Sequence, residues 1–430
     1  MSPLTRICMW VEKLTGVIVL IPHPAVVGNC GEQIYHALLK ARREGRKLAI
    51  LSQYRLPWPL GIRLTNQELF AVESDLLAFS ASSFWYRLGS LAVTAYVAIA
   101  RLLNLFFRRL GHPLSDADIY PCIGHTTLWQ PTETIAEFSW EVVAGYDWPA
   151  QLKSPLPIWL SSRKKEVAIR ERDRLGLPRD AWFVCLHVRE GGFHRDNMVE
   201  RNADILNYVE AIKEVTGRGG WVVRMGDPTM TRLPAMDRVI DYPFSIARSP
   251  LMDIYLIREC RAYIGMPSGI LEVATLFHRP TILTNMPSWL WPYPTKWGEV
   301  GVFKHVYSKS RQRYLSLREW MDEPFESVSF FALGSDYILV ENDAEELRAT
   351  VQEFFERNGD GEPTPLQREC SNLRLQRGRA LVNKPMIIQD AFSDIHNRYR
   401  VASHLESAIG VISDAYLKQN WERDSRQEKP

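Results

Sequence analysis

Two side chains that can bind an anion end one apolar run in the second half of the sequence. The run Trp182–Arg189 predicts a buried strand, with His187 and Arg189 two residues apart at its carboxyl end. Side chains with this spacing point to the same face of a strand. Arg189 carries a permanent charge on a planar fork of N–H donors, which can neutralise a diphosphate without a metal. The alternatives are a hydrogen bond from His187 to a neighbouring loop and an ion pair between Arg189 and Glu190.

A second candidate site follows a later strand, at the sequence Pro267-Ser268-Gly269. A helix that begins there offers free backbone N–H groups and its positive end to a diphosphate. Gly269 lets a phosphate approach the backbone closely. The alternative is that Ser268 and Gly269 only cap the helix.

Strands and helices alternate regularly around these residues. We predict strands at residues 182–189, 221–225, 262–265 and 281–285, and helices at 201–215, 252–260 and 270–277, the first capped by Asn202 or Asp204. Continuous apolar strands that alternate with helices indicate a parallel sheet covered on both faces. Such sheets bind ligands beyond the carboxyl ends of their strands. The substrate-binding candidates at this edge are His187, Arg189, Arg201, Asp227, Ser268, Gly269 and Glu272.

The N-terminal half opens with a similar unit. Residues 17–21 predict a strand, 22–31 a loop of small residues, 32–43 a helix and 47–52 a second strand. Gly28 and Asn29 lie in that loop, as substrate contacts or as part of a plain turn. The glycine spacing does not match the dinucleotide-binding pattern G-x-G-x-x-G.

Length and composition favour two α/β domains. A chain of 430 residues exceeds one ordinary core, and 46% hydrophobic with 24% charged residues is typical of a globular protein. We expect an N-terminal domain at 1–150, a C-terminal domain at 160–400, and a closing helix with a polar tail at 401–430 that packs on the N-terminal domain. The net charge of +2 gives no indication of nucleic-acid binding.

The most apolar stretch, Leu88–Phe107, is flanked by Arg87 and by Arg108 and Arg109. A helix of this length would just cross a bilayer, but its apolar character is interrupted by Ser90, Thr94, Arg101 and Asn104. We first expect a helix buried between domains, then a helix lying in the plane of a membrane surface, and last a true span.

No metal or other cofactor is expected. The six cysteines are dispersed, without the spacing of a zinc site. Asp116 and Asp118 form a D-x-D sequence, but it precedes a predicted strand instead of following one.

Two α/β domains facing a cleft, with the richer site in the second, are the plan of a GT-B glycosyltransferase. The sequences H-V-R at 187–189, G-D-P at 226–228 and Y-I-G-M-P-S-G-I-L-E-V-A at 263–274 resemble a bacterial family of glycosyltransferases found among surface-polysaccharide genes. The resemblance extends from the P-H-P-A-x-x-G-N sequence at 22–29 to E-N-D at 341–343. The His-x-Arg strand end is also similar to fucosyltransferase-like enzymes, which implies that Arg189 contacts the donor diphosphate.

The resemblance implies a nucleotide-sugar donor and a glycan or lipid-linked acceptor. The dispersed cysteines favour a cytoplasmic protein, and we expect the Leu88–Phe107 helix to contact the inner face of the membrane peripherally, if at all. An inverting transfer needs a general base near neutral pKa, and we expect His23 or His125 to supply it from the N-terminal domain. The other hypotheses are a different nucleotide-sugar-modifying α/β enzyme and a non-catalytic nucleotide-sugar-binding protein.

Overall fold

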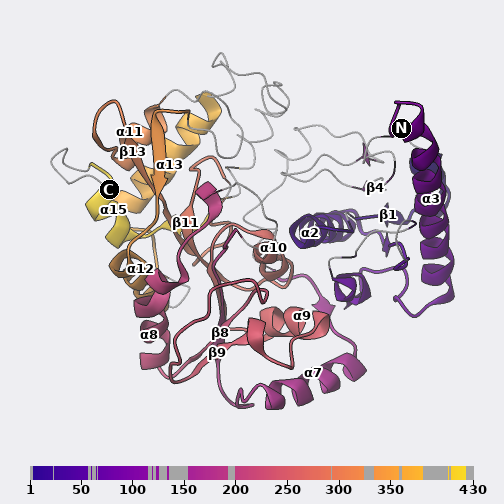
Figure 1. Cartoon of the computed structure of the whole chain (residues 1–430), viewed down its shortest axis with the longest axis horizontal. Coiled ribbons are helices and arrows are strands. Elements are labelled where there is room, and N and C mark those ends of the chain that lie inside the picture. Colours follow the sequence, from indigo (N-terminus) through magenta and orange to yellow (C-terminus); the bar gives the residue numbers. More distant parts are fainter. Residues whose placement is uncertain are drawn as a thin grey trace.

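The computed structural model describes residues 3–22, 24–56, 60, 64, 66–114, 119, 123–124, 133–134, 154–191, 199–291, 293–323, 334–357, 361–380, 405 and 408–422. Figure 1 shows two α/β parts side by side, an N-terminal part around α2 and β1 and a C-terminal part around the larger sheet. Both parts contain parallel strands, and a cavity lies between them. The predicted fold class, α/β with two Rossmann-like parts facing a cleft, is confirmed.

The N-terminal part is built on a β-α-β unit. Its elements are α1 (Pro3–Thr15), β1 (Ile18–Leu20), α2 (Val27–Glu44), β2 (Leu48–Ile50), η1 (Gln67–Ala71), β3 (Glu73–Ser74), α3 (Phe84–Arg109), β4 (Ile123–Gly124) and β5 (Glu133–Thr134). β1 and β2 pair in parallel, as predicted. The strand β3 pairs with β6 (Ile158–Trp159), which leads into the C-terminal part through α7 (Ser162–Arg174). The exact domain boundaries stay a prediction.

The C-terminal part contains a parallel sheet of seven strands in the order β16-β12-β11-β10-β7-β8-β9. Its strands are β7 (Phe183–His187), β8 (Trp221–Arg224), β9 (Val239–Asp241), β10 (Ala262–Gly265), β11 (Thr281–Met286), β12 (Val300–Phe303) and β16 (Val411–Ile412). The four strands predicted from the sequence are confirmed. The chain runs outward from β7 through β8 to β9 and then returns to the other side of β7 with β10. The strand order therefore reverses between β7 and β10, which is where such sheets bind ligands.

Helices cover both faces of this sheet. The helices of this part are η2 (Val199–Arg201), η3 (Ile205–Tyr208), α8 (Val209–Gly217), η4 (Tyr242–Phe244), α9 (Pro250–Glu259), α10 (Gly269–Leu276), α11 (Leu317–Asp322), α12 (Ala344–Arg357), α13 (Pro365–Ala380) and α15 (Asp414–Asn420). Along β7, Val184 and Leu186 pack toward α8 and α12, whereas Phe183 and Cys185 pack toward the core that α9 and α10 share. A small antiparallel sheet of β14 (Arg313–Tyr314), β13 (His305–Ser308) and β15 (Tyr337–Val340) lies beside α11 and α12.

The two parts meet where α2 crosses α10 (Figure 1). A Cβ atom added to Gly28 would lie 2.6 Å from the Cα atom of Gly269, and one added to Gly31 would lie 3.3 Å from the backbone of Glu272. Glycines at the crossing thus let the two backbones touch. The predicted loop at 22–31 is wrong in its second half, because α2 begins at Val27. Packing against α10 offsets the low helix propensity of these glycines.

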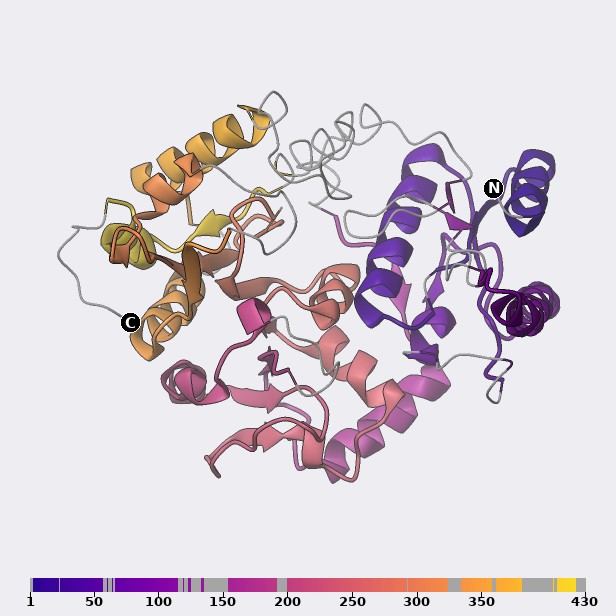
Figure 2. The same cartoon turned by 45° about the horizontal axis from the view of Figure 1, so that its top comes forward.

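The apolar helix α3 lies at the outer edge of the N-terminal part, away from the C-terminal part (Figure 1). The expectation of a helix buried between domains is therefore wrong. Among the described residues, α3 is the one helix long and apolar enough to cross a membrane, and 33% of its most apolar stretch is buried. Figure 2 shows α1 beside α3, which is seen end-on.

The closing segment packs differently from the prediction. Instead of one helix over 402–421, the described residues form β16, which extends the large sheet by pairing with β12, and then the short α15. α15 packs against α12 and α13, and Asn420 donates a hydrogen bond to Glu346 over 3.1 Å. The expectation that this helix packs on the N-terminal part is wrong, because the preceding strand fixes it to the C-terminal sheet.

Candidate functional site

A cavity of about 490 Å³ lies between the two parts at the carboxyl edge of the large sheet. This volume is in the range of small-molecule sites. The N-terminal part contributes residues 25–29 and Asn66, and the C-terminal part contributes the rest of the lining. The structure brings all nine sequence-predicted site residues that it describes to this cavity: Gly28, Asn29, His187, Arg189, Arg201, Asp227, Ser268, Gly269 and Glu272.

His187, the last residue of β7, lines the cavity. Its Nδ1 atom lies 3.2 Å from the Oγ atom of Ser268. Burial lowers the pKa of His187 to about 4, and the charge of the nearby Arg224 contributes to the shift. The imidazole is therefore neutral at neutral pH. The contact with Ser268 fixes the ring beside the cavity.

Three arginines reach the cavity from three different segments. Arg189, after β7, is only 8% exposed and donates a hydrogen bond to Asn202 Oδ1. Arg201, at the end of η2, donates to the carbonyl oxygen of Pro267 over 3.2 Å. Arg248 precedes α9 and donates to the carbonyl oxygen of Gly226 over 3.3 Å. Guanidinium groups keep their charge at all relevant pH values, so the cavity has three fixed positive charges.

Two helices also begin at the cavity, α2 at Val27 and α10 at Gly269. In the described part of the chain, neither N-cap residue, Val26 or Ser268, forms a side-chain capping hydrogen bond. The Ser268 hydroxyl contacts His187 and lies 3.5 Å from Tyr263 Oη. Ser268 is thus the N-cap residue of α10 by its backbone, while its hydroxyl contacts other side chains. The positive ends of two helix dipoles meet at one cavity, which favours an anionic ligand.

The carboxyl groups near the cavity are largely occupied by other partners. Glu190 accepts hydrogen bonds from the fully buried Arg224 over 3.0 Å and from the Thr231 backbone N–H over 2.8 Å. Asp227 Oδ1 accepts from both the backbone and the hydroxyl of Thr229, which stabilises the turn after β8. Burial raises the pKa of Asp253, whose Oδ1 atom accepts a hydrogen bond from Tyr242 over 2.8 Å.

Glu272 lies in the first turn of α10, buried against α2. Burial raises its pKa to about 7, although a hydrogen bond from the Tyr293 hydroxyl and the charge of Lys296 favour the ionised form. Lys296 itself forms an ion pair with Glu299 at 3.1 Å. Glu272 thus titrates near neutral pH at the wall of the cavity. A carboxyl group with such a pKa can exchange a proton with a bound ligand or, when protonated, donate a hydrogen bond to it.

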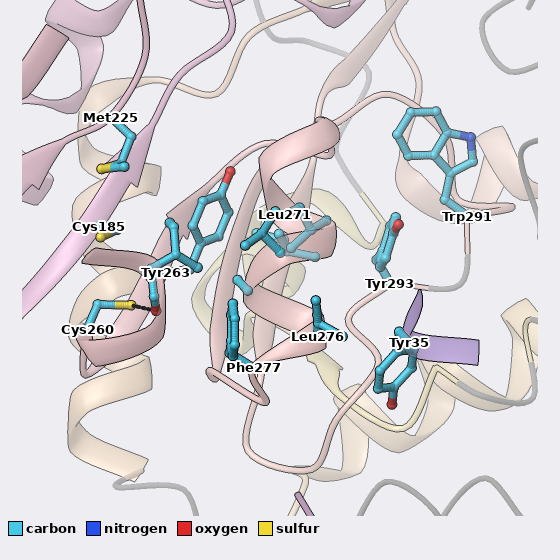
Figure 3. Close-up of a cluster of buried hydrophobic side chains, with 14 of the residues drawn as sticks. Tyr35, Cys185, Met225, Cys260, Tyr263, Leu271, Leu276, Phe277, Trp291 and Tyr293 are labelled. Atoms are coloured by element: carbon cyan, nitrogen blue, oxygen red, sulfur yellow. Dashed lines mark hydrogen bonds between the residues drawn. The ribbon is translucent and has the colours of Figure 1, made fainter. Parts of the chain in front are cut away.

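Aromatic side chains form another wall of the cavity. Figure 3 shows Trp291 and Tyr293 on the side of α10 that faces Tyr35. The ring centroids of Trp291 and Tyr293 are 6.3 Å apart, and the Arg201 guanidinium lies 5.9 Å from the Trp291 ring centroid. Both aromatic residues lie in the segment that follows β11.

Four polar lining residues are absent from the predicted site: Asn66, Glu190, Arg248 and Asp253. Arg248 follows β9, a strand of three partly exposed residues that no apolar run in the sequence marks. Asn66 lies in the N-terminal part, and its Nδ2 atom donates to the carbonyl oxygen of Pro250 over 2.9 Å. No sequence signal marks a contact between two segments so far apart.

Some candidates cannot be located. His23, His125, Asp116 and Asp118 lie outside the described residues. Among the residues that are described, no group of three His, Cys, Asp or Glu side chains could hold a metal ion.

No family model matches the sequence, and no curated protein does. Three similar solved structures are glycosyltransferases by their names. The glycosyl transferase family 9 protein from Veillonella parvula is 13% identical over 63% of this chain and 81% of that chain, with a TM-score of 0.33. The E. coli ADP-heptose LPS heptosyltransferase II is 15% identical over 63% of this chain and 85% of that chain, with a TM-score of 0.31. The dodecameric iron-containing heptosyltransferase TibC in complex with ADP-D-beta-D-heptose is 20% identical, but the match spans 26% of this chain and 30% of that chain, with a TM-score of 0.19. TM-scores this low support no conclusion about this chain, so its function is argued from the cavity itself.

Proposed function

We propose that this protein is a GT-B-type glycosyltransferase that moves a sugar from a nucleotide-sugar donor to a glycan or glycoconjugate acceptor. The observation that carries the proposal is the cavity between the two α/β parts. Three arginines and the N-termini of two helices converge there, at the point where the strand order reverses. This combination suits a doubly charged diphosphate better than a neutral ligand.

The breaking sugar–phosphate bond leaves its electron pair on the diphosphate. Stabilising that developing charge is the main electrostatic task of such a transferase. Arg189 is held at the end of β7 by its hydrogen bond to Asn202 and is the arginine that we place on the donor diphosphate. Arg201 and Arg248 supply two further charges, so the reaction is proposed to proceed without a metal.

The aromatic wall suits the rest of the donor. Trp291 and Tyr293 present flat apolar surfaces on which a nucleobase or a sugar ring can stack. Asn29 and Gly28, at the start of α2, bring the N-terminal part against the same space. We propose that the acceptor approaches from this N-terminal side.

The acceptor hydroxyl must lose its proton as the new glycosidic bond forms. We propose that His23 or His125 takes this proton, with attack from the side opposite the diphosphate. The acceptor is a glycan or a lipid-linked glycan, and the enzyme works in the cytoplasm in the assembly of surface polysaccharide. The resemblance of residues 263–274 to glycosyltransferases of surface-polysaccharide genes supports this role.

A panel of nucleoside diphosphates and nucleotide sugars tests the proposal by thermal stabilisation. A ligand that binds only the native state raises the melting temperature. We expect at least one nucleoside diphosphate to stabilise the protein and the matching nucleoside to stabilise it much less. If nucleosides and their diphosphates act equally, the diphosphate site is wrong.

The competing proposal is a protein that binds nucleotide sugar without transferring it. It is favoured if a nucleotide sugar stabilises the protein but no nucleoside diphosphate is released in the presence of candidate acceptors. A nucleotide-sugar-modifying enzyme of another class would instead change the sugar while leaving it attached to the diphosphate.

A further inference from the structure

The outer face of helix α3 is more apolar than that of an ordinary surface helix. Its buried stripe is mixed, with polar Ser90, Thr94 and Asn104 beside apolar Val93, Val97 and Ala100. Thr94 Oγ1 accepts a hydrogen bond from the backbone N–H of Tyr54 over 2.7 Å, and Asn104 Oδ1 accepts one from that of Leu114 over 2.8 Å. The opposite face, directed away from the protein, is apolar. Its exposed large side chains are Phe84, Trp85, Leu88, Leu91, Ile99, Leu102, Leu103, Leu105 and Phe106.

The neighbouring helix α1 extends this apolar face. Its side chains Ile7, Trp10 and Leu14 are exposed, and Trp10 is 63% accessible. On the inner side, Leu4 and Cys8 of α1 share one core cluster with Val93 of α3. Figure 2 shows the two helices side by side at the same edge of the molecule. Among the described residues, 13 of the 18 exposed large hydrophobic side chains belong to α1, to α3 or to the α3 C-cap residue Leu110, so the exposure is concentrated at one place.

The charges around this face are positive. The helix α3 contains four arginines and no acidic residue. Arg87 near its start and Arg108 and Arg109 at its end are exposed. The one acidic residue of α1, Glu12, pairs with Arg46 at 2.8 Å. A wide apolar surface with exposed arginines near both ends of α3 and two exposed tryptophans, Trp10 and Trp85, matches the boundary between acyl chains and anionic headgroups.

We propose that α1 and α3 together form a membrane-docking surface that binds an anionic lipid bilayer, with both helices in the plane of the membrane. The apolar side chains enter the acyl boundary, and the arginines remain at the headgroups. This inference does not depend on the proposed sugar transfer.

The structure favours an in-plane orientation over a span. The inner stripe of α3 is buried from Ser90 to Asn104. The backbone N–H groups of Ser52 and Tyr54 donate hydrogen bonds to its Ser90 and Thr94 hydroxyls, which attach it to the N-terminal part. To cross the bilayer, α3 would have to lose those contacts. The helix is about 39 Å long at 1.5 Å per residue, so it lays a long apolar stripe on the surface without crossing it.

Vesicle flotation with the full chain tests this inference. One set of vesicles contains phosphatidylcholine and phosphatidylglycerol in equal parts, and the other contains phosphatidylcholine alone. We expect the protein to float with the anionic vesicles and to bind the neutral vesicles more weakly. High salt should weaken binding to the anionic vesicles toward the level seen with the neutral ones, because it screens only the electrostatic part. Release by alkaline carbonate is also expected, and retention after carbonate would contradict the in-plane orientation.

Two double variants sharpen the test. Leu91→Glu/Leu102→Glu places charges on the proposed surface at positions that are 58% and 52% exposed. Partitioning to vesicles should fall at least about a hundredfold, since each leucine contributes about tenfold when it is buried in an apolar phase. The control, Leu206→Glu/Ile246→Glu, changes two exposed apolar residues of the C-terminal part and should float like the unmodified protein.

Two outcomes would overturn the proposal. One is that the Leu91→Glu/Leu102→Glu protein floats as well as the unmodified protein, or that the unmodified protein floats with neither kind of vesicle. The other is that the unmodified protein forms a dimer in solution that this double variant abolishes, without any binding to vesicles. The apolar face would then be an interface between two copies of the chain.

Discussion

Removing the guanidinium group of Arg189 tests the proposed diphosphate site more directly than any other single substitution. We expect Arg189→Met to weaken the binding of a nucleoside diphosphate while leaving the binding of the matching nucleoside almost unchanged. Methionine keeps an apolar stem of similar length, so the packing around this 92% buried position is largely retained. Only the charge and its hydrogen bonds are lost.

The expected effect follows from the burial of Arg189 and from its neighbours. A charge-assisted hydrogen bond contributes about 1.5–3 kcal/mol, which corresponds to about tenfold to 150-fold in Kd. Arg189 is poorly exposed to solvent, so screening is weak and favours the upper part of this range. Arg201 and Arg248 remain in the cavity and keep some attraction for the diphosphate, which limits the loss.

Titration calorimetry with the stabilising nucleoside diphosphate and with its nucleoside measures this effect. Arg174→Met serves as the control, because Arg174 is an exposed arginine of α7 that pairs with Glu171 away from the cavity. The control should bind both ligands like the unmodified protein. If Arg189→Met binds the diphosphate as tightly as the unmodified protein does, or loses affinity for both ligands equally, the assignment of Arg189 to the diphosphate is refuted.

Three further predictions concern the walls of the cavity and the proton transfer. Burial raises the pKa of Glu272 from 4.5 to about 7. As pH rises between these values, the unmodified protein should therefore lose stability relative to a Glu272→Gln variant, by about 1.4 kcal/mol per pH unit. Denaturant titrations of both proteins at several pH values measure this difference, and parallel stability profiles would show that the pKa is not raised. Gly28→Ala should destabilise the fold by about 1–3 kcal/mol because the added Cβ atom would overlap the α10 backbone. The control Gly217→Ala adds a Cβ atom with nothing within 4 Å and should not show this cost. Equal denaturation midpoints for the two variants would argue against the close crossing of α2 and α10. One of His23→Ala and His125→Ala should lower turnover by about 10²–10⁴ with nucleotide binding retained, and near-normal turnover in both would rule out histidine as the general base.

The sequence predicts the C-terminal sheet well because its signals are local. The runs that become β7, β8, β10 and β11 are continuous and apolar, and each ends in a turn marked by polar or small residues. In a parallel sheet the carboxyl ends of neighbouring strands meet at one edge. His187, Asp227 and Ser268 could therefore be brought together without knowledge of the strand order.

The errors arise where tertiary contacts override local signals. The start of α2 contains two glycines and was expected to be a loop, but the approach to α10 favours a helix there. The strand β16 has only two residues, and its pairing with β12 depends on chain segments more than 100 residues apart. The sequence shows Ser90, Thr94 and Asn104 only as polar interruptions of an apolar stretch, but in the structure all three lie on the inner face of α3.

The central claim is that a nucleoside diphosphate binds between the two α/β parts. A crystal structure of the protein with the nucleoside diphosphate that stabilises it most would test this claim directly. We predict that the diphosphate lies at the N-terminus of α10, within hydrogen-bond distance of the Gly269 backbone N–H and of the Arg189 guanidinium. A diphosphate bound at another place, with the cavity lined by His187 and Ser268 left to solvent, would contradict the account.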